Sequence, residues 1–208
     1  MIAEGHTRQV GILVFDEVEV LDMAGPFEVF SVASRLMLRQ RPAEPPPFGV
    51  ALVSADGGTV RARGGLRLTP DRSITDAPPF DIVVVPGGIV DAPERDPIVT
   101  SWVRERWTSS AVVASVCTGA FVLAAAGLLD GLKVTTHRED QAVLARRYPA
   151  VRVVGDRRWV DHGRIATSGG ISAGIDLSLH LVGRFLGIGH ARATAHQMEY
   201  DWRESPAG

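Results

Sequence analysis

The stretch from Ala111 to Ala126, AVVASVCTGAFVLAAA, constrains the fold more than any other part of this sequence. Its first half consists of small and β-branched apolar residues, and its second half is apolar, rich in helix formers and free of proline. This pattern predicts a buried strand, a sharp turn and a helix, with Cys117 at the turn. The stretch therefore predicts an α/β fold whose only cysteine lies at the carboxyl edge of a sheet.

The position of Cys117 at a strand-to-helix corner suits a nucleophile. The first N–H groups of a helix and its partial positive charge favour a thiolate, so we expect the thiol pKa to be lowered. Gly119 lets the helix approach closely without a side chain in the way. This is the logic of the GxSxG nucleophile elbow, although SVCTG lacks the first glycine. The alternative is a buried cysteine that acts as a small hydrophobe, and the stretch alone leaves both open.

Three other apolar runs have the composition of strands that are buried on both faces of a sheet. They are VGILVF (residues 10–15), FGVALVS (48–54) and the start of DIVVVPGG (81–88). Helical patterns alternate with these runs, and such alternation predicts a mostly parallel sheet covered by helices on both faces. In that topology three loops meet at one edge: the Asp22 loop after the first strand, the Gly87–Gly88 turn and the Cys117 elbow.

Several shorter elements are also expected. Asp96 to Trp107 predicts a helix that Asp96 caps, with Ile98, Trp102 and Val103 on one face. Residues 55–71 predict hairpin-like pieces between Gly-Gly pairs. The second half predicts a surface helix over 138–148, short strands around Gly155 and Gly163, a long apolar helix after Gly170, and a final helix from about His190 to Trp202.

Length and composition favour a single domain over residues 1–208, with an ordered core of about 10–202. One cysteine excludes an internal disulfide, and no Cys/His spacing resembles a zinc site, so we expect no metal and no cofactor. A formal charge of −2 with dispersed arginines gives no basic stripe for nucleic acid. No apolar run is long enough for a bilayer and MIAEGHTRQV has no signal core, so we expect a cytoplasmic protein without membrane contact.

Five motifs follow one another along the chain: LDMAGPFEVF, VVVPGG, SVCTGAFVLAAAGLLDG, TTH and SGGISAGID. In this order they resemble the ThiJ/PfpI superfamily, which is related to class I glutamine amidotransferases, and the resemblance covers roughly Val10 to Trp202. It implies a flavodoxin-like sandwich and, as is usual in the family, a homodimer. It also implies a small-molecule substrate for a cysteine nucleophile.

Two positions indicate the branch of the superfamily. Peptidase-, glyoxalase- and deglycase-like members carry a glutamate in the first loop, where this sequence has Asp22. The peptidase-like members have a histidine after the cysteine, where this sequence has Thr118. The combination is similar to isocyanide hydratases and to the sensor domains of AraC-type regulators. Regulators add a helix-turn-helix region, for which no residues follow Gly208, so we expect a hydratase.

The resemblance also assigns roles. Cys117 is expected to attack the isocyanide carbon, giving a thioimidate that water converts to an N-substituted formamide. Asp22 is expected to hold a proton, because burial and like-charge repulsion raise its pKa. The N–H groups of Gly88 and Thr118 are expected to stabilise the developing anion. His137 lies where several members place a histidine that pairs with the thiolate.

Each assignment has a structural alternative. Asp22 could cap the first helix, Thr118 could be a simple N-terminal helix residue, and His137 could be a hydrogen-bonded structural histidine. Two other functions also stay open. One is a glyoxalase- or deglycase-like enzyme, and the other is a non-catalytic ligand or redox sensor in which Cys117 is oxidised.

Overall fold

A seven-stranded sheet forms the centre of the computed structural model, which describes residues 6–207. Residues 1–5 and 208, which the single-domain prediction includes, lie outside the described residues. The strand order is β10-β11-β7-β6-β1-β2-β5. The strands are β1 (Arg8–Leu13), β2 (Phe48–Ser54), β5 (Arg72–Ser73), β6 (Ile82–Val85), β7 (Val112–Ser115), β10 (Trp159–Asp161) and β11 (Ile165–Ser168).

The sheet is parallel except where β10 pairs with β11. Successive residues of its central strands point to two different cores, as strands buried on both faces require. In β6, for example, Ile82 and Val84 belong to one core, whereas Val83 and Val85 belong to the other. The prediction of a mostly parallel sheet with helices on both faces is confirmed.

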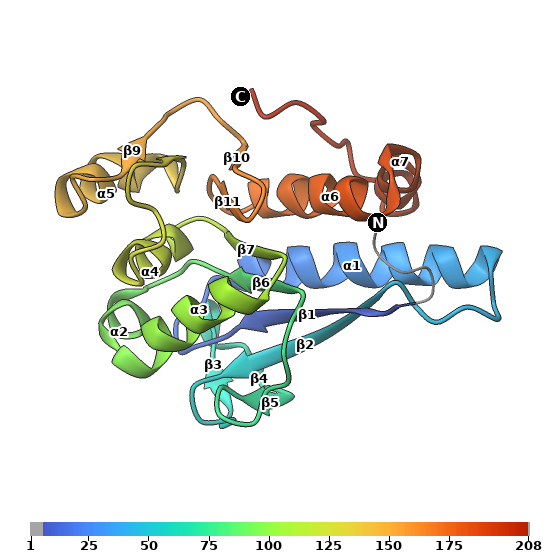
Figure 1. Cartoon of the computed structure of the whole chain (residues 1–208), viewed down its shortest axis with the longest axis horizontal. Helices are drawn as coiled ribbons and strands as arrows, with labels where there is room; N and C mark the ends of the chain where they lie inside the picture. Colours follow the sequence, from blue (N-terminus) through green and yellow to red (C-terminus); the bar gives the residue numbers. More distant parts are fainter. Residues whose placement is uncertain (1–5, 208) are drawn as a thin grey trace.

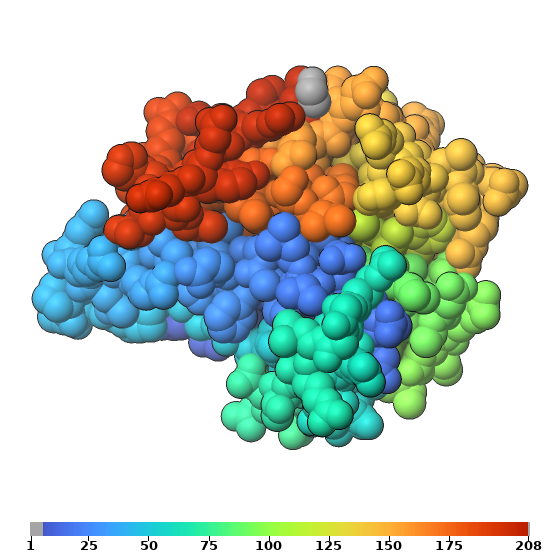
Figure 2. Space-filling model, turned by 180° about the vertical axis from the view of Figure 1, so that it is seen from behind, coloured from blue at the N-terminus to red at the C-terminus, as the bar shows by residue number. Residues whose placement is uncertain are grey.

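Two groups of helices cover these two faces (Figure 1). On one face lie α1 (Val20–Gln40), α6 (Ala173–Leu186) and α7 (Ile188–Gln197), and on the other lie α2 (Asp91–Arg95), α3 (Pro97–Ser109) and α4 (Gly119–Ala125). From the opposite side, Figure 2 shows the C-terminal helices lying on α1. Among the described residues, every helix is too short or too polar to span a bilayer.

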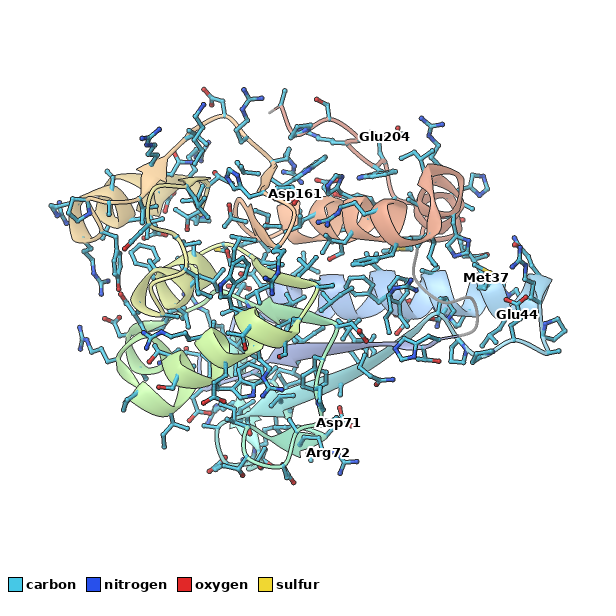
Figure 3. The ribbon with its side chains drawn as sticks, viewed as in Figure 1. Met37, Glu44, Asp71, Arg72, Asp161 and Glu204 are labelled. Carbon is cyan, nitrogen blue, oxygen red and sulfur yellow. The ribbon has the colours of Figure 1, made fainter. Side chains whose placement is uncertain are left out.

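Small elements surround the main sheet. The expected hairpin is formed by β3 (Val60–Arg61) and β4 (Arg67–Leu68), with a 3-10 turn at Arg63–Gly65. The segment that follows leads to the edge strand β5, where Figure 3 labels Asp71 and Arg72. Beyond α4, the parallel strands β8 (Lys133–Val134) and β9 (Arg152–Val153) flank a 3-10 turn at Arg138–Asp140 and helix α5 (Gln141–Arg147).

The start of the first helix corrects one prediction. Asp22 lies in the first turn of α1 and not in the preceding loop, because the helix begins at Val20, ahead of Pro26. A proline this close to the helix start removes a single backbone hydrogen bond, the one to the Asp22 carbonyl, so the helix tolerates it. Asp22 is thereby held on a regular element.

Two other features differ from the expectation: the exposure of Ile98 and the end of the final helix. Ile98 is 58% exposed, because the buried stripe of α3 consists of Val99, Trp102 and Val103 at i, i+3 and i+4. The final helix ends at Gln197 and not at Trp202. The chain reverses there, since Glu199 adopts a positive φ of 50°.

The crossing of α4 over β6 leaves no space at Gly119. A Cβ atom built there would lie 2.1 Å from the carbonyl oxygen of Val85 and 2.8 Å from that of Pro86. Both neighbours are backbone atoms of the central sheet, so neither can yield without moving a strand. The close contact of the elbow with β6 therefore requires glycine at this position.

We predict that Gly119→Ala lowers the free energy of unfolding by at least about 3 kcal/mol, because the added methyl group displaces backbone. Gly189→Ala in α7 is the matched control, since its Cβ would meet nothing within 4 Å. Alanine is the better helix former there, so the control is expected to be neutral or stabilising by up to about 1 kcal/mol. Urea unfolding of the three proteins checks this, and equal effects of the two substitutions would contradict the packing argument.

Candidate active site

Cys117 occupies the turn between β7 and α4 in a strained backbone conformation. Its φ is 54°, the left-handed region that costs a residue with a side chain about 1–3 kcal/mol. Two hydrogen bonds hold it there: its N–H donates to the oxygen of Gly169 (3.2 Å), and its carbonyl accepts from Thr136 Oγ1 (2.7 Å). The expected nucleophile elbow is therefore present, and the residue is 6% exposed.

The carboxyl group of Asp22 meets this elbow from the first turn of α1. It is fully buried, and its Oδ2 accepts from the N–H of Gly87 (3.0 Å). Within residues 6–207, its Oδ1 has no N–H or O–H donor, and Asp22 makes no capping bond in α1. The carboxyl group lies close enough to the Cys117 thiol for each group to shift the pKa of the other. The structure thus brings together two side chains that are far apart in the sequence.

Burial changes the protonation of both groups. It raises the pKa of Asp22 to about 7, while the N–H of Gly87 and the thiol of Cys117 offset part of this and the charge of Glu19 adds to it. Burial, and then the charge of Asp22, raises the pKa of Cys117 to about 12. The expected lowering of the thiol pKa was therefore wrong. Loss of water and a neighbouring carboxylate outweigh the N–H groups of a seven-residue helix.

The expected anion-stabilising pair is arranged differently from the prediction. The N–H of Thr118 does reach the thiol and lowers its pKa in part. The N–H of Gly88 donates instead to Thr118 Oγ1 (2.9 Å), whose hydroxyl also lies 2.9 Å from the Gly88 oxygen. The Thr118 side chain therefore occupies the donor that was expected to face the anion.

A second N–H group on the sulfur comes from Ile171, which sequence analysis missed. It lowers the thiol pKa in part, as Thr118 does. Ile171 has a φ of 35°, which is a rare conformation for a β-branched residue. The signal in the sequence was Gly169–Gly170 just before it, since such glycines let a chain approach another closely. Thr118 and Ile171 are thus the two backbone donors at the thiol.

His137 packs against Gly170. Its Nδ1 is 3.3 Å from Asp140 Oδ2, and a Cβ at Gly170 would come within 2.1 Å of its Cδ2. Among residues 6–207, no hydrogen bond joins His137 to Cys117. These contacts favour a structural histidine over a partner of the thiol.

The geometry can be compared with known proteins. A model of the DJ-1/PfpI family matches residues 8–184. The chain belongs to the DJ-1/PfpI family. This DJ-1/PfpI chain is also similar to a solved ThiJ/PfpI family protein from Pseudomonas syringae, with a TM-score of 0.82 and 25% identity over 95% of this chain and 77% of that one. The resemblance seen in the motifs is confirmed.

Curated relatives of this DJ-1/PfpI chain include an enzyme and a regulator. It is 35% identical to an isonitrile hydratase from Pseudomonas putida over 194 residues, which cover 92% of this chain and 78% of the relative. It is 29% identical to the HTH-type transcriptional regulator GbdR from Pseudomonas aeruginosa, covering 94% of this chain and 52% of the regulator. The chain thus spans about half the length of that regulator.

We predict that Asp22→Asn removes the loss of stability that the Asp22 carboxyl causes as the pH rises. The folded state holds the Asp22 proton up to about pH 7, whereas the ordinary pKa is 3.8. The folded state therefore binds more protons between these values, and its stability falls as pH rises through them, by at most about 4 kcal/mol. Asparagine cannot titrate, so the variant gains on the wild type across this window and the difference is constant above it.

Urea unfolding of both proteins from about pH 4 to about pH 8 measures this difference. Glu28→Gln is the control, since Glu28 is an exposed carboxylate on the same helix. A difference between wild type and Asp22→Asn that does not change with pH would mean that the carboxyl keeps its ordinary pKa.

Proposed function

We propose that this protein catalyses the cofactor-free hydration of an isocyanide to an N-substituted formamide, with Cys117 as the nucleophile. The observation that carries the proposal is the proximity of the Cys117 thiol to the buried Asp22 carboxyl at a strained elbow. A sequence identity of 35% to an isonitrile hydratase over most of the chain supports the choice of substrate.

The first half of the reaction adds the thiol across the isocyanide carbon. Sulfur attacks this carbon while the S–H proton passes to the Asp22 carboxylate and then to the carbon, giving the thioimidate Cys–S–CH=N–R. One proton is thus shared between two groups, and no proton is gained or lost. A carboxyl pKa of about 7 suits this transfer near neutral pH. The N–H groups of Thr118 and Ile171 stabilise negative charge on the sulfur during the attack.

The second half hydrolyses the thioimidate. Asp22, again ionised, takes a proton from water as the water oxygen attacks the former isocyanide carbon, and the nitrogen receives that proton. The tetrahedral adduct then breaks its C–S bond, releasing R–NH–CHO, and the hydroxyl proton returns to the sulfur through Asp22. The sum is one isocyanide and one water converted to one formamide.

A sensor is the second candidate, because the chain is 29% identical to the regulator GbdR over 94% of its own length. A redox version needs a thiolate that peroxide oxidises readily. The Cys117 thiol, with its pKa raised to about 12, is protonated at neutral pH. The protonation of the pair therefore favours the hydratase, in which the base removes the proton only during attack.

We predict that Cys117→Ala abolishes isocyanide turnover and that Asp22→Asn lowers kcat about 10²- to 10⁴-fold, the range typical of a lost general acid–base. In the wild type, kcat/KM should rise with pH through about 7, since Asp22 must be ionised to accept the thiol proton. The Asp22→Asn variant should lack this rise, and Glu28→Gln should keep it.

Formamide release measured at several pH values with an alkyl and an aryl isocyanide checks this. Turnover by Cys117→Ala would rule out the covalent route. Wild-type protein that binds isocyanides but releases no formamide would favour the sensor. A parallel assay with methylglyoxal tests the glyoxalase-like alternative.

We also predict that His137→Asn keeps kcat within about threefold of the wild type, because the His137 ring lies beside Asp140 and packs on Gly170, and no hydrogen bond among the described residues joins it to the thiol. Steady-state kinetics with thermal unfolding on the same sample separates activity from folding. A drop of a hundredfold in kcat with unchanged stability would place His137 in the reaction.

A further inference from the structure

A cavity of about 430 Å³ lies beside the elbow, next to the 169–170 segment. Segments 136–141, 156–158 and 169–173 contribute its lining. Two of its lining residues, Thr136 and Gly169, hydrogen-bond the backbone of Cys117. Among the described residues, neither Asp22 nor Thr118 lines it, so the cavity is a neighbour of the candidate active site and not a part of it.

The charged groups in this cavity are mainly cationic. Arg138, Arg157 and Arg158 line it, and Asp156 is the carboxylate among its lining residues. Arg158 is neutralised by the buried Asp176, to which its Nε donates at 2.8 Å. Within residues 6–207, Arg138 and Arg157 form no ion pair with a carboxylate. Arg138 and Arg157 are thus exposed arginines at the cavity whose charges no carboxylate of the described residues neutralises.

The framework that carries these arginines is held by hydrogen bonds. The N–H of Arg158 donates to Pro206, its oxygen accepts from the N–H of Gly169, and Arg157 forms a bridge with Ala207 in the C-terminal segment. On the other side, the N–H of Asp140 donates to the oxygen of His137 and closes the turn that carries Arg138. A fixed backbone lowers the entropy that binding must overcome.

We propose that this cavity binds a small organic anion carrying carboxylate or phosphate groups, with Arg138 and Arg157 as its charge partners. Guanidinium groups match the planar, bidentate geometry of these anions. The volume lies in the range of small-molecule sites, which is about 300–1,000 Å³. A bare inorganic ion would leave much of it to water, since one water takes about 30 Å³. The amide of Gln141, which also lines the cavity, supplies a neutral donor.

Isothermal titration of the full chain with citrate at constant ionic strength tests the proposal, with chloride as the reference ion. We expect saturable binding of one citrate per chain and at least tenfold weaker binding of inorganic phosphate. The double variant Arg138→Ala/Arg157→Ala should bind citrate at least tenfold more weakly. Arg146→Ala is the matched control, because Arg146 is exposed on α5 and does not line the cavity.

The Cys117→Ala variant tests whether the anion site is separate from the nucleophile, and this test does not depend on any hydratase activity. It should bind citrate as the wild type does, whereas loss of binding would put the anion on the nucleophile and overturn the separate site. Absence of saturable binding, full affinity in the double variant, or equal losses in the double variant and Arg146→Ala would each overturn it as well. Phosphate binding as tight as citrate binding would overturn the organic anion as ligand. Circular dichroism of every variant confirms that it is folded.

Discussion

The contact between the Asp22 carboxyl and the Cys117 thiol is the constraint on which the rest of the site depends. It requires the first turn of α1 to reach the end of β7, two strands away in the sheet. That approach leaves no room for side chains between the elements. A Cβ at Gly87 would lie 2.6 Å from the Thr118 nitrogen and 2.8 Å from Asp22 Oδ2. The lack of a side chain at Gly87 is therefore needed for the approach of Asp22 to Cys117 as well as for the turn.

The same contact sets the protonation of the site. Two acids that share a buried space cannot both ionise cheaply, because each charge disfavours the other. Burial dominates here, so the carboxyl titrates near pH 7 and the thiol far above it. Near neutral pH the thiol is protonated and the carboxyl is divided between its acid and carboxylate forms. The carboxylate form is the one that can accept the thiol proton when sulfur attacks an electrophile.

The sequence was informative where local rules decide the structure. Apolar runs, the helical spacing and the turn at Cys117 predicted the sheet, the elbow and the meeting of three loops at one edge. It was less informative where tertiary contacts compete. The helix N-terminus at Cys117 suggested a lowered thiol pKa, but the desolvation that reverses it depends on packing between distant elements. The N–H donor of Ile171 likewise depends on a strained φ that the sequence does not predict, since isoleucine rarely adopts it.

The segment from Gly169 to Ile171 contributes to both the elbow and the arginine-rich cavity. Ile171 contributes an N–H to the sulfur, whereas Gly169 and Gly170 line the cavity. The buried Asp176 holds the residues beside this segment in place. It pairs with Arg158 and accepts hydrogen bonds from Tyr200 and from the backbone of Arg203. Removing one partner of such a pair leaves a buried charge without compensation, which costs far more than the pair contributes. The pairing of Arg158 with Asp176 therefore ties the residues beside the cavity to helix α6 and to the C-terminal segment, and it leaves Arg138 and Arg157 as the cavity's unpaired arginines among the described residues.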